Sequence, residues 1–234
     1  MWVNVTIRQM PKPEGKAVIT ACVSCYIIGV KTVEILYEDD DSLVINKPAG
    51  LAVQGGKGVK TSLDGILAAM RSPPPFLVHR LDKDTSGVIL TAKTKEAAAR
   101  FSRLLGVGRK AVKQYIAVCA GCPPKSEGVI TVDLLIRGSL KKSETRYRVI
   151  QSGEFSVLEL ELGTGRMHQI RRHLSLSGNP VLGDDKYGDF ALNKTLRKTS
   201  GLKRLLLHAS RLIIGDIHLD ISAPVPDYFR SFMF

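Results

Sequence analysis

The segment 79–87, His-Arg-Leu-Asp-Lys-Asp-Thr-Ser-Gly, constrains this chain most, because it surrounds one carboxylate with potential cations just before a turn. Asp82 carries that carboxylate, and three neighbours would keep it ionised and directed at a positively charged group: His79, Arg80 and Lys83. Gly87 closes the segment and is free to adopt the positive φ that tight turns require. Apolar residues at 76–78 and 88–92 predict a strand on each side. A charged cluster between two buried strands predicts a functional site on a rigid scaffold.

The 234-residue chain has a formal net charge of +12, from 34 Lys and Arg against 22 Asp and Glu. Basic residues gather in two stretches, 137–148 and 194–211. A charge of this size predicts a polyanionic partner, and clustered basic residues favour nucleic acid over a membrane surface. The alternative is that the basic residues only solvate the surface.

No apolar stretch reaches the roughly 18 residues that a membrane-spanning helix needs. The longest, 17–30, is preceded by Pro11, Pro13 and Glu14, and no convincing cleavage pattern follows it, which argues against a secretory signal. We therefore predict a strand or hairpin packed on the main domain, and no membrane partner. An organelle transit peptide stays open, since residues 1–33 contain a single acidic residue. The compartment is accordingly left open between cytoplasm and mitochondrial matrix.

The four cysteines form two Cys-x-x-Cys pairs, Cys22/Cys25 and Cys119/Cys122. Zinc ribbons place such pairs about 15–20 residues apart, whereas these pairs are widely separated in the chain. Cys119 also falls in an alternating apolar segment that predicts a strand. Buried reduced thiols are the favoured interpretation, and a zinc-bound interaction module is the alternative. We predict no metal.

The pattern along the chain predicts an extension, residues 1–34, followed by one domain, residues 35–234. Periodicity and turn residues predict helices at 62–70, 94–105 and 168–177, and strands at 33–37, 42–46, 76–78, 88–92, 112–120, 128–130, 132–136, 144–150, 155–162, 205–214 and 217–221. The regular βαβ alternation of a parallel sheet is missing. We therefore predict an α+β fold, with a mixed, mostly antiparallel central sheet and flanking helices.

A second basic cluster, at 163–173, opens the third predicted helix. Arg171 shares a helix face with apolar residues, where a guanidinium is costly unless it meets a carboxylate. Asp82 is the preferred partner, and a structural salt bridge with any other acid is the alternative. Four further residues are expected nearer solvent, where a phosphate can meet the positive helix end: Arg166, His168, Gln169 and Arg172. Two tyrosines could stack a base: Tyr115, with core packing as the alternative, and Tyr187, for which a loop anchor is the favoured interpretation.

Several sequence blocks carry a resemblance to a known family. His-Arg-Leu-Asp-x-x-Thr-Ser-Gly at 79–87 is preceded by Leu-Val-Ile-Asn-Lys-Pro-Ala-Gly-Leu at 43–51 and followed by Lys-x-Tyr-x-Ala at 113–117. Gly-Arg-x-His-Gln-Ile-Arg-x-His at 165–173, Gly-Asp-x-x-Tyr-Gly at 183–188 and Leu-Leu-His-Ala at 206–209 complete the set. In this order they resemble the RluA-type family of RNA pseudouridine synthases over roughly residues 35–225.

The resemblance implies an isomerase that converts uridine to pseudouridine in a structured RNA, ribosomal or transfer, without a cofactor. It implies that Asp82 is catalytic, that Tyr115 stacks on the target base, that Arg171 pairs with Asp82, and that Arg80 assists base flipping. Together with the basic clusters it assigns RNA binding to seven residues: His79, Arg80, Lys83, Arg166, His168, Gln169 and Arg172.

The chain also departs from the family pattern. Residues 1–34 are too short and too apolar for the small RNA-binding module that many bacterial members carry, so RNA selection is expected to rest on the catalytic domain or on partners. Met167 stands where Thr or Ser is common, and residues 122–146 are short beside relatives with insertions. We expect a monomer and leave ribonucleoprotein partners open. The rival interpretation is an RNA-binding assembly factor that keeps the fold without turnover.

Overall fold

The computed structural model describes residues 24–28, 31–106 and 111–233. In chain order its strands are β1 (Ser24–Ile28), β2 (Lys31–Glu38), β3 (Ser42–Lys47), β4 (Phe76–Leu77), β5 (Ser86–Ala92), β6 (Ala111–Ala120), β7 (Glu127–Ile130), β8 (Leu134–Ile136), β9 (Ser139–Lys141), β10 (Thr145–Gln151), β11 (Phe155–Leu162), β12 (Leu207–Ile214) and β13 (Leu219–Ser222). The α-helices are α1 (Leu63–Met70), α2 (Lys95–Leu105), α3 (Gln169–Leu176) and α4 (Phe190–Thr199), with 3₁₀ turns at Gly215–Ile217 and Asp227–Phe232.

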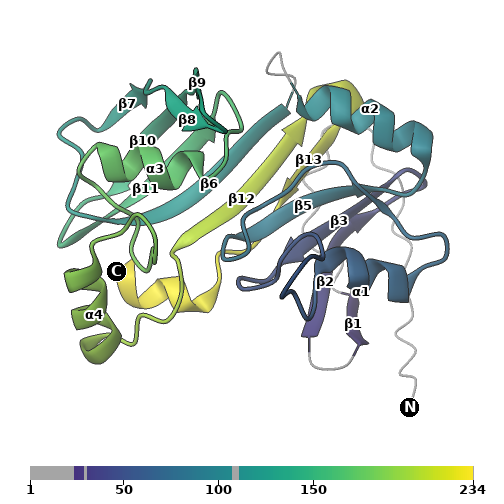
Figure 1. The fold of residues 1–234 in the computed structure, drawn as a ribbon, viewed down its shortest axis with the longest axis horizontal. Coiled ribbons are helices and arrows are strands. Elements are labelled where there is room, and N and C mark those ends of the chain that lie inside the picture. Colours follow the sequence, from purple (N-terminus) through teal and green to yellow (C-terminus); the bar gives the residue numbers. More distant parts are fainter. Residues whose placement is uncertain (1–23, 29–30, 107–110, 234) are drawn as a thin grey trace.

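An 11-stranded sheet runs through the molecule in the order β1-β2-β3-β5-β12-β6-β11-β10-β7, with β13 beside β12 and β4 beside β5 (Figure 1). Among the described strands, β5 and β12 pair in parallel, whereas the other neighbours are antiparallel. Strands β8 and β9 form a separate hairpin. The predicted α+β fold with a mixed, mostly antiparallel sheet is confirmed.

The two faces of the sheet carry different helices, because side chains alternate along each strand. On β6, Tyr115 and Ala117 join the core under α1 and α3, whereas Ile116 and Val118 point to the opposite face. That opposite face is covered in two parts, by α2 near β5 and by α4 with the C-terminal 3₁₀ turn. Tyr115 therefore lies on the sheet face beneath α1 and α3.

Helix α4 was not predicted from the sequence. Asp189 caps it by accepting a hydrogen bond from the N–H of Leu192, and the buried residues it contributes are few, Asn193 and Leu196. With so few apolar positions the periodicity of the segment is weak, and the capping aspartate is its clearest signal. The three predicted helices are confirmed within a few residues at their ends.

The described residues include only part of the N-terminal segment for which a strand or hairpin was predicted. Most of 17–30, together with Cys22, lies outside the described residues, and β1 forms a hairpin with β2. Strand β2 runs across the expected boundary between residues 34 and 35, so the division into extension and domain stays a prediction. Cys119 is buried, as expected, but Cys122 is exposed. Within the described part of the chain, no three His, Cys, Asp or Glu side chains are grouped to hold a metal, and no helix could span a bilayer.

The parallel pair β5–β12 joins the two halves of the sheet at their centre (Figure 1). Gly87 lies opposite Ala209 there with φ of +111°, and a Cβ on Gly87 would stand 2.1 Å from the carbonyl oxygen of Ala209. Beside it, buried His208 contacts the Ser86 hydroxyl through Nδ1 at 2.9 Å. Burial lowers the pKa of His208 to about 4, so the imidazole is neutral at this junction. The close approach explains why glycine is needed at position 87.

We predict that Gly87→Ala destabilises the protein by at least about 3 kcal/mol, because the added methyl collides with backbone as well as straining φ. The measurement is urea unfolding followed by circular dichroism. Gly58→Ala is the matched control, since Gly58 has φ of +80° and no other atom within 4 Å of the place that a Cβ would take. It should cost only about 1–2 kcal/mol. Equal losses in the two variants would contradict the steric explanation.

Candidate active site

A cavity of about 560 Å³ opens between the 79–85 segment and the start of α3. Its size falls within the range typical of small-ligand sites. Asp82 and Tyr115 line it together with their near neighbours Arg80 and Lys113 and with residues from later in the chain, Arg137, Arg166, His168 and Arg171. The sequence segments singled out above therefore converge on one site.

Backbone contacts hold the loop that carries Asp82. Lys47, whose side chain is fully buried, donates through Nζ to the carbonyl oxygens of Pro48, Leu51 and Lys83. The N–H of Gly50 donates to the same Lys83 oxygen, at 2.9 Å. The loop is thus fixed immediately after Asp82 by a buried ammonium, and the Asp82 side chain remains 22% exposed toward the cavity.

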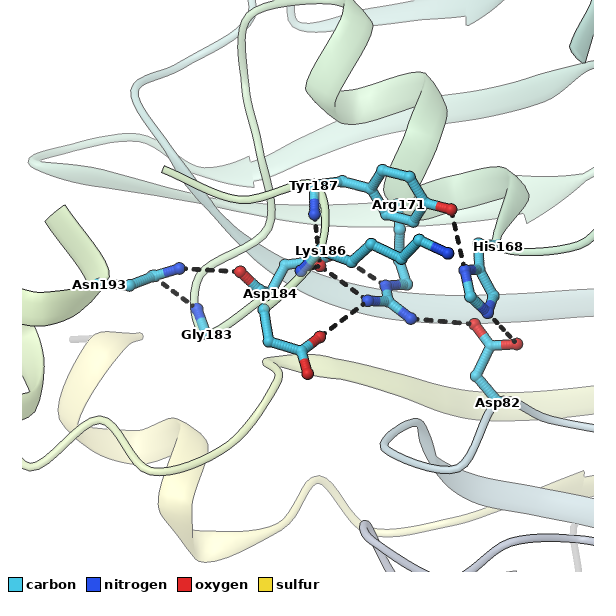
Figure 2. A network of polar contacts seen from close by, with 9 residues as sticks. Asp82, His168, Arg171, Gly183, Asp184, Lys186, Tyr187 and Asn193 are labelled. Atoms are coloured by element: carbon cyan, nitrogen blue, oxygen red, sulfur yellow. Dashed lines mark hydrogen bonds and ion pairs between the residues drawn. The ribbon is translucent and has the colours of Figure 1, made fainter. Parts of the chain in front are cut away.

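Arg171 makes its shortest contacts with an acid that the sequence analysis did not select. Its Nε and Nη2 donate to the two carboxylate oxygens of Asp184, both at 2.7 Å, and both side chains are buried (Figure 2). Nη2 also lies 3.3 Å from Asp185. Asp82, the partner preferred from the sequence, is therefore not the nearest acid, and the alternative of a structural salt bridge describes the closer pair. A bidentate pair holds a guanidinium in one orientation, which leaves Nη1 free to face elsewhere.

That remaining nitrogen faces Asp82. Arg171 Nη1 lies 3.7 Å from Asp82 Oδ2, and His168 Nε2 lies 3.7 Å from Asp82 Oδ1 (Figure 2). Each of the two carboxylate oxygens therefore has one side-chain nitrogen facing it. Both distances exceed a hydrogen-bond length, so the contacts are electrostatic rather than hydrogen bonds. The predicted proximity of Asp82 and Arg171 is confirmed by this geometry, whereas the catalytic roles stay predictions.

The ionisation of Asp184 and Arg171 follows from their contacts. Burial alone would raise the pKa of Asp184, but hydrogen bonds from Arg171 and from the N–H groups of Tyr187 and Lys186 outweigh it and lower that pKa. For Arg171, burial would lower the pKa, and the charge and hydrogen bonds of Asp184 raise it instead. The pair is therefore a buried, fully charged ion pair at neutral pH.

Tyr115 reaches the cavity from β6 and is 8% exposed. Burial raises the pKa of its hydroxyl, and the negative charge of Asp82 raises it further, so the ring stays neutral. Lys113, two residues earlier on the same strand, donates to the carbonyl oxygen of Leu105 at 2.9 Å. The cavity wall thus offers an apolar ring close to a carboxylate.

His79 is not the cation that the sequence analysis expected beside Asp82. Its Nε2 accepts a hydrogen bond from the N–H of Leu90 at 2.9 Å. Burial, and then the charge of Lys113, lower the pKa of His79 to about 3, so it is neutral. It lines the cavity as an uncharged ring that fastens the loop to β5.

Of the other predicted RNA-binding residues, some line the cavity and others lie outside it. Arg80 and Arg166 are exposed and line the cavity, whereas Lys83 is exposed outside it. Gln169, expected near solvent, is 3% exposed, and its amide contacts Thr164, Arg166, Glu144 and Thr145 within the protein. Arg172 lies outside the cavity lining and donates to the carbonyl oxygen of Leu135 at 3.2 Å.

Three contributors were not assigned to the site from the sequence. Arg137 lies at the tip of the β8–β9 hairpin with φ of +48°, next to Gly138 with φ of +79°, and it lines the cavity. Two consecutive positive φ values are typical of a two-residue hairpin turn, and the Arg-Gly dipeptide was the available signal. Asp184 and Tyr187 belong to the Gly-Asp-x-x-Tyr-Gly block, but nothing local in that block indicates that they contact Arg171.

Comparison with known proteins places this fold and cavity in a defined class. The family model for RNA pseudouridylate synthase matches residues 41–176, more than half of the chain. The chain therefore belongs to the RNA pseudouridylate synthase family.

Particular relatives agree with this assignment. Ribosomal large subunit pseudouridine synthase C of Vibrio vulnificus is 39% identical over 190 residues, which cover 76% of this chain and 60% of the relative. The protein of the same name from Escherichia coli K12 is 39% identical over 194 residues, with the same two coverages. This chain therefore spans about three fifths of the length of these two relatives. Among solved structures, human RNA pseudouridylate synthase domain containing 4 matches with a TM-score of 0.72 and 29% identity, over 84% of this chain and 90% of the human one.

We predict that Asp184→Asn costs about 3–5 kcal/mol of stability at pH 7, because it leaves the buried Arg171 charge without its main partner.

The pH dependence of the unfolding free energy should change as well. Since the pKa of Asp184 is lowered on folding from an ordinary value of 3.8, its contribution is present above that value and is lost as the pH falls below it. The wild type should therefore lose more stability than the variant between pH 5 and acidic pH in urea unfolding. Asp40→Asn, at an exposed carboxylate, is the control and should change stability by less than about 0.5 kcal/mol. A variant whose acid-induced loss equals that of the wild type would contradict this account.

Proposed function

We propose that this protein is an RNA pseudouridine synthase that converts uridine to pseudouridine in large-subunit ribosomal RNA. The observation that carries the proposal is the Asp82 carboxylate, flanked by Arg171 and His168 in a cavity that also contains the Tyr115 ring. Family membership supports the reaction, and the names of the curated relatives favour ribosomal RNA over the transfer RNA that the sequence left equally open.

The reaction breaks the bond between C1′ of the ribose and N1 of uracil, rotates the base, and joins C1′ to C5; C5 then loses its proton and N1 gains one, so the product is an isomer. Positive charge develops on the sugar as the glycosidic bond breaks, and a carboxylate beside C1′ and C2′ stabilises that charge. Asp82 supplies the carboxylate, either by attacking C1′ or by removing the C2′ proton. Both routes need an ionised acid, and the Arg171 guanidinium lies 3.7 Å from its Oδ2. This chemistry uses protein groups alone.

The target uridine must leave its helix before it can reach the cavity. Extrusion costs a few kcal/mol, because stacking and pairing are lost. In our proposal the base stacks on Tyr115, and Arg80, exposed at the cavity rim, occupies the space that the base leaves. The apolar character of the Tyr115 ring and its place beside Asp82 support this arrangement.

The cavity rim provides contacts for the RNA backbone. Arg80, Arg137 and Arg166 are exposed there, and they come from the 79–87 segment, the β8–β9 hairpin and the residues before α3. Three guanidinium groups around one opening suit the phosphates that flank an extruded nucleotide. Lys83 and Arg172, which lie outside the cavity lining, are more distant candidates for the same role.

We predict that Asp82→Asn folds normally and loses activity by roughly 10²–10⁴-fold, because the amide cannot act as base or nucleophile. The measurement is pseudouridine formation in large-subunit rRNA transcripts, read by mass spectrometry of nuclease digests. Asp84→Asn is the matched control, since it makes the same change in the same loop at a residue outside the cavity lining, and it should keep near wild-type turnover.

The possible outcomes separate the alternatives. Pseudouridine formed by Asp82→Asn at the wild-type rate would refute the catalytic assignment. Tight RNA binding without any product from the wild type would favour the rival assembly factor. Product in transfer RNA but not in large-subunit rRNA would refute the proposed substrate.

We further predict that RNA affinity falls steeply with salt. The arginines at the rim displace cations that are bound along the RNA phosphates, and high salt opposes that release. Replacing both Arg137 and Arg166 by Gln should lower the slope of log affinity against log salt by roughly 1 for each cation removed. Filter binding at a series of KCl concentrations measures the slope. Lys57→Gln, at an exposed cation outside the cavity, should leave it unchanged. The same slope in the double variant would mean that the two arginines do not contact phosphate.

A further inference from the structure

Tyr187 does not line the cavity, yet it contacts both residues that flank Asp82 (Figure 2). The Arg171 guanidinium lies over its ring, 5.2 Å from the centroid. Its hydroxyl oxygen lies 3.1 Å from Nδ1 of His168, and the two rings meet edge to face at 5.6 Å. One half-buried side chain thus connects the two nitrogen donor groups that face the catalytic carboxylate.

The backbone around Tyr187 is fixed by the same acid that holds Arg171. Asp184 Oδ1 accepts hydrogen bonds from the N–H groups of Lys186 and Tyr187, both at 2.9 Å. The 183–188 loop therefore supports Asp82 along two routes. One runs from Asp184 through Arg171 to Oδ2, and the other runs from Tyr187 through His168 to Oδ1.

His168 adopts a backbone conformation that suits this second route. Its φ is +52° and its ψ is 30°, in the left-handed region that non-glycine residues enter at a cost. It stands at the N-terminus of α3 without a side-chain hydrogen bond that would cap the helix. The side chain instead points at Tyr187 and Asp82 (Figure 2). Such strain persists where the surrounding structure holds the residue for another purpose.

Electrostatics select one tautomer of the His168 ring. Burial is the largest cause that lowers the pKa of His168 below its ordinary 6.5, with Asp82 and Asp184 acting to raise it and Arg171 and Lys186 to lower it, so the imidazole is neutral at pH 7. A neutral imidazole carries a single N–H. If that proton were on Nδ1, the lone pair of Nε2 would face the Asp82 carboxylate and repel it. With the Tyr187 hydroxyl donating to Nδ1, the proton lies on Nε2 and points at Asp82.

We propose that Tyr187 and His168 are positioning residues for Asp82, with the Tyr187 hydroxyl holding His168 in the Nε2–H tautomer that faces the carboxylate. As far as catalysis is concerned, this inference rests on the proposed function. The neutral Nε2–H group of His168 orients Oδ1 of Asp82. It adds no positive charge beyond that of Arg171, which lies beside Oδ2. Both gaps of 3.7 Å leave room for the carboxylate to shift against the sugar, and such contacts commonly tighten only when substrate is bound.

The first test reads the tautomer directly and needs no RNA. In two-dimensional NMR spectra that correlate ring protons with ring ¹⁵N, the His168 signals are assigned by their loss in His168→Gln. We expect Nε2 protonated and Nδ1 unprotonated in the wild type, and a mixture of tautomers in Tyr187→Phe. Tyr37→Phe is the matched control, because its hydroxyl contacts Asp39 on the surface and should leave the His168 signals unchanged. A wild-type ring protonated on Nδ1, or signals that do not respond to Tyr187→Phe, would overturn the proposal.

The second test asks whether the donor matters for turnover. Tyr187→Phe keeps the ring under Arg171 and should lower kcat about tenfold with little change in KM. His168→Leu should lower kcat more, whereas His168→Gln, which offers an N–H near the position of Nε2, should recover part of the loss. Equal activity of the Gln and Leu variants, or a change confined to KM, would overturn the positioning role. An inactive wild type would refute the proposed function instead, and the tautomer measurement would still decide the Tyr187–His168 contact.

Discussion

The buried ion pair between Arg171 and Asp184 is the interaction on which the site depends. Two hydrogen bonds of 2.7 Å fix the guanidinium within the protein, and the carboxylate also organises the loop that contains Tyr187. Both side chains are buried, so removing one acid or base leaves the other without its closest partner, at a cost of several kcal/mol. The pair holds Arg171 in one orientation, and this orientation directs its remaining nitrogen at Asp82.

The site also depends on how the two halves of the sheet meet. Asp82 precedes β5 in one half, whereas Tyr115 lies on β6 and Arg171 on α3 in the other (Figure 1). Strand β12 lies between β5 and β6, and the absence of a side chain at Gly87 allows β5 to approach it. A displacement at this junction would separate the carboxylate from its partners, although none of the junction residues contributes to the chemistry itself.

Charge at the site is distributed unevenly in a way that suits the proposed chemistry. Histidines that the sequence left available as cations are neutral here, because burial and the charge of Lys113 lower the pKa of His79 and burial lowers that of His168. Positive charge is concentrated on arginines, with Arg171 behind the carboxylate and Arg137 and Arg166 at the rim. The carboxylate thus has one fixed cation beside it, while exposed guanidinium groups remain available for phosphates.

The sequence alone determined the strands and helices with clear periodicity, the freedom of Gly87 to adopt a positive φ, and the identity of Asp82, Tyr115 and Arg171 as residues that share one site. Those properties follow from local backbone freedom, from alternation of apolar residues and from motifs, all of which are written along the chain. Only the tertiary structure decided that Arg171 pairs most closely with Asp184, that the Gln169 amide is used internally, and that Tyr187 joins Arg171 to His168. The physical reason is that the partner and the charge of a side chain depend on distance and desolvation among residues brought together by folding, and local patterns carry neither.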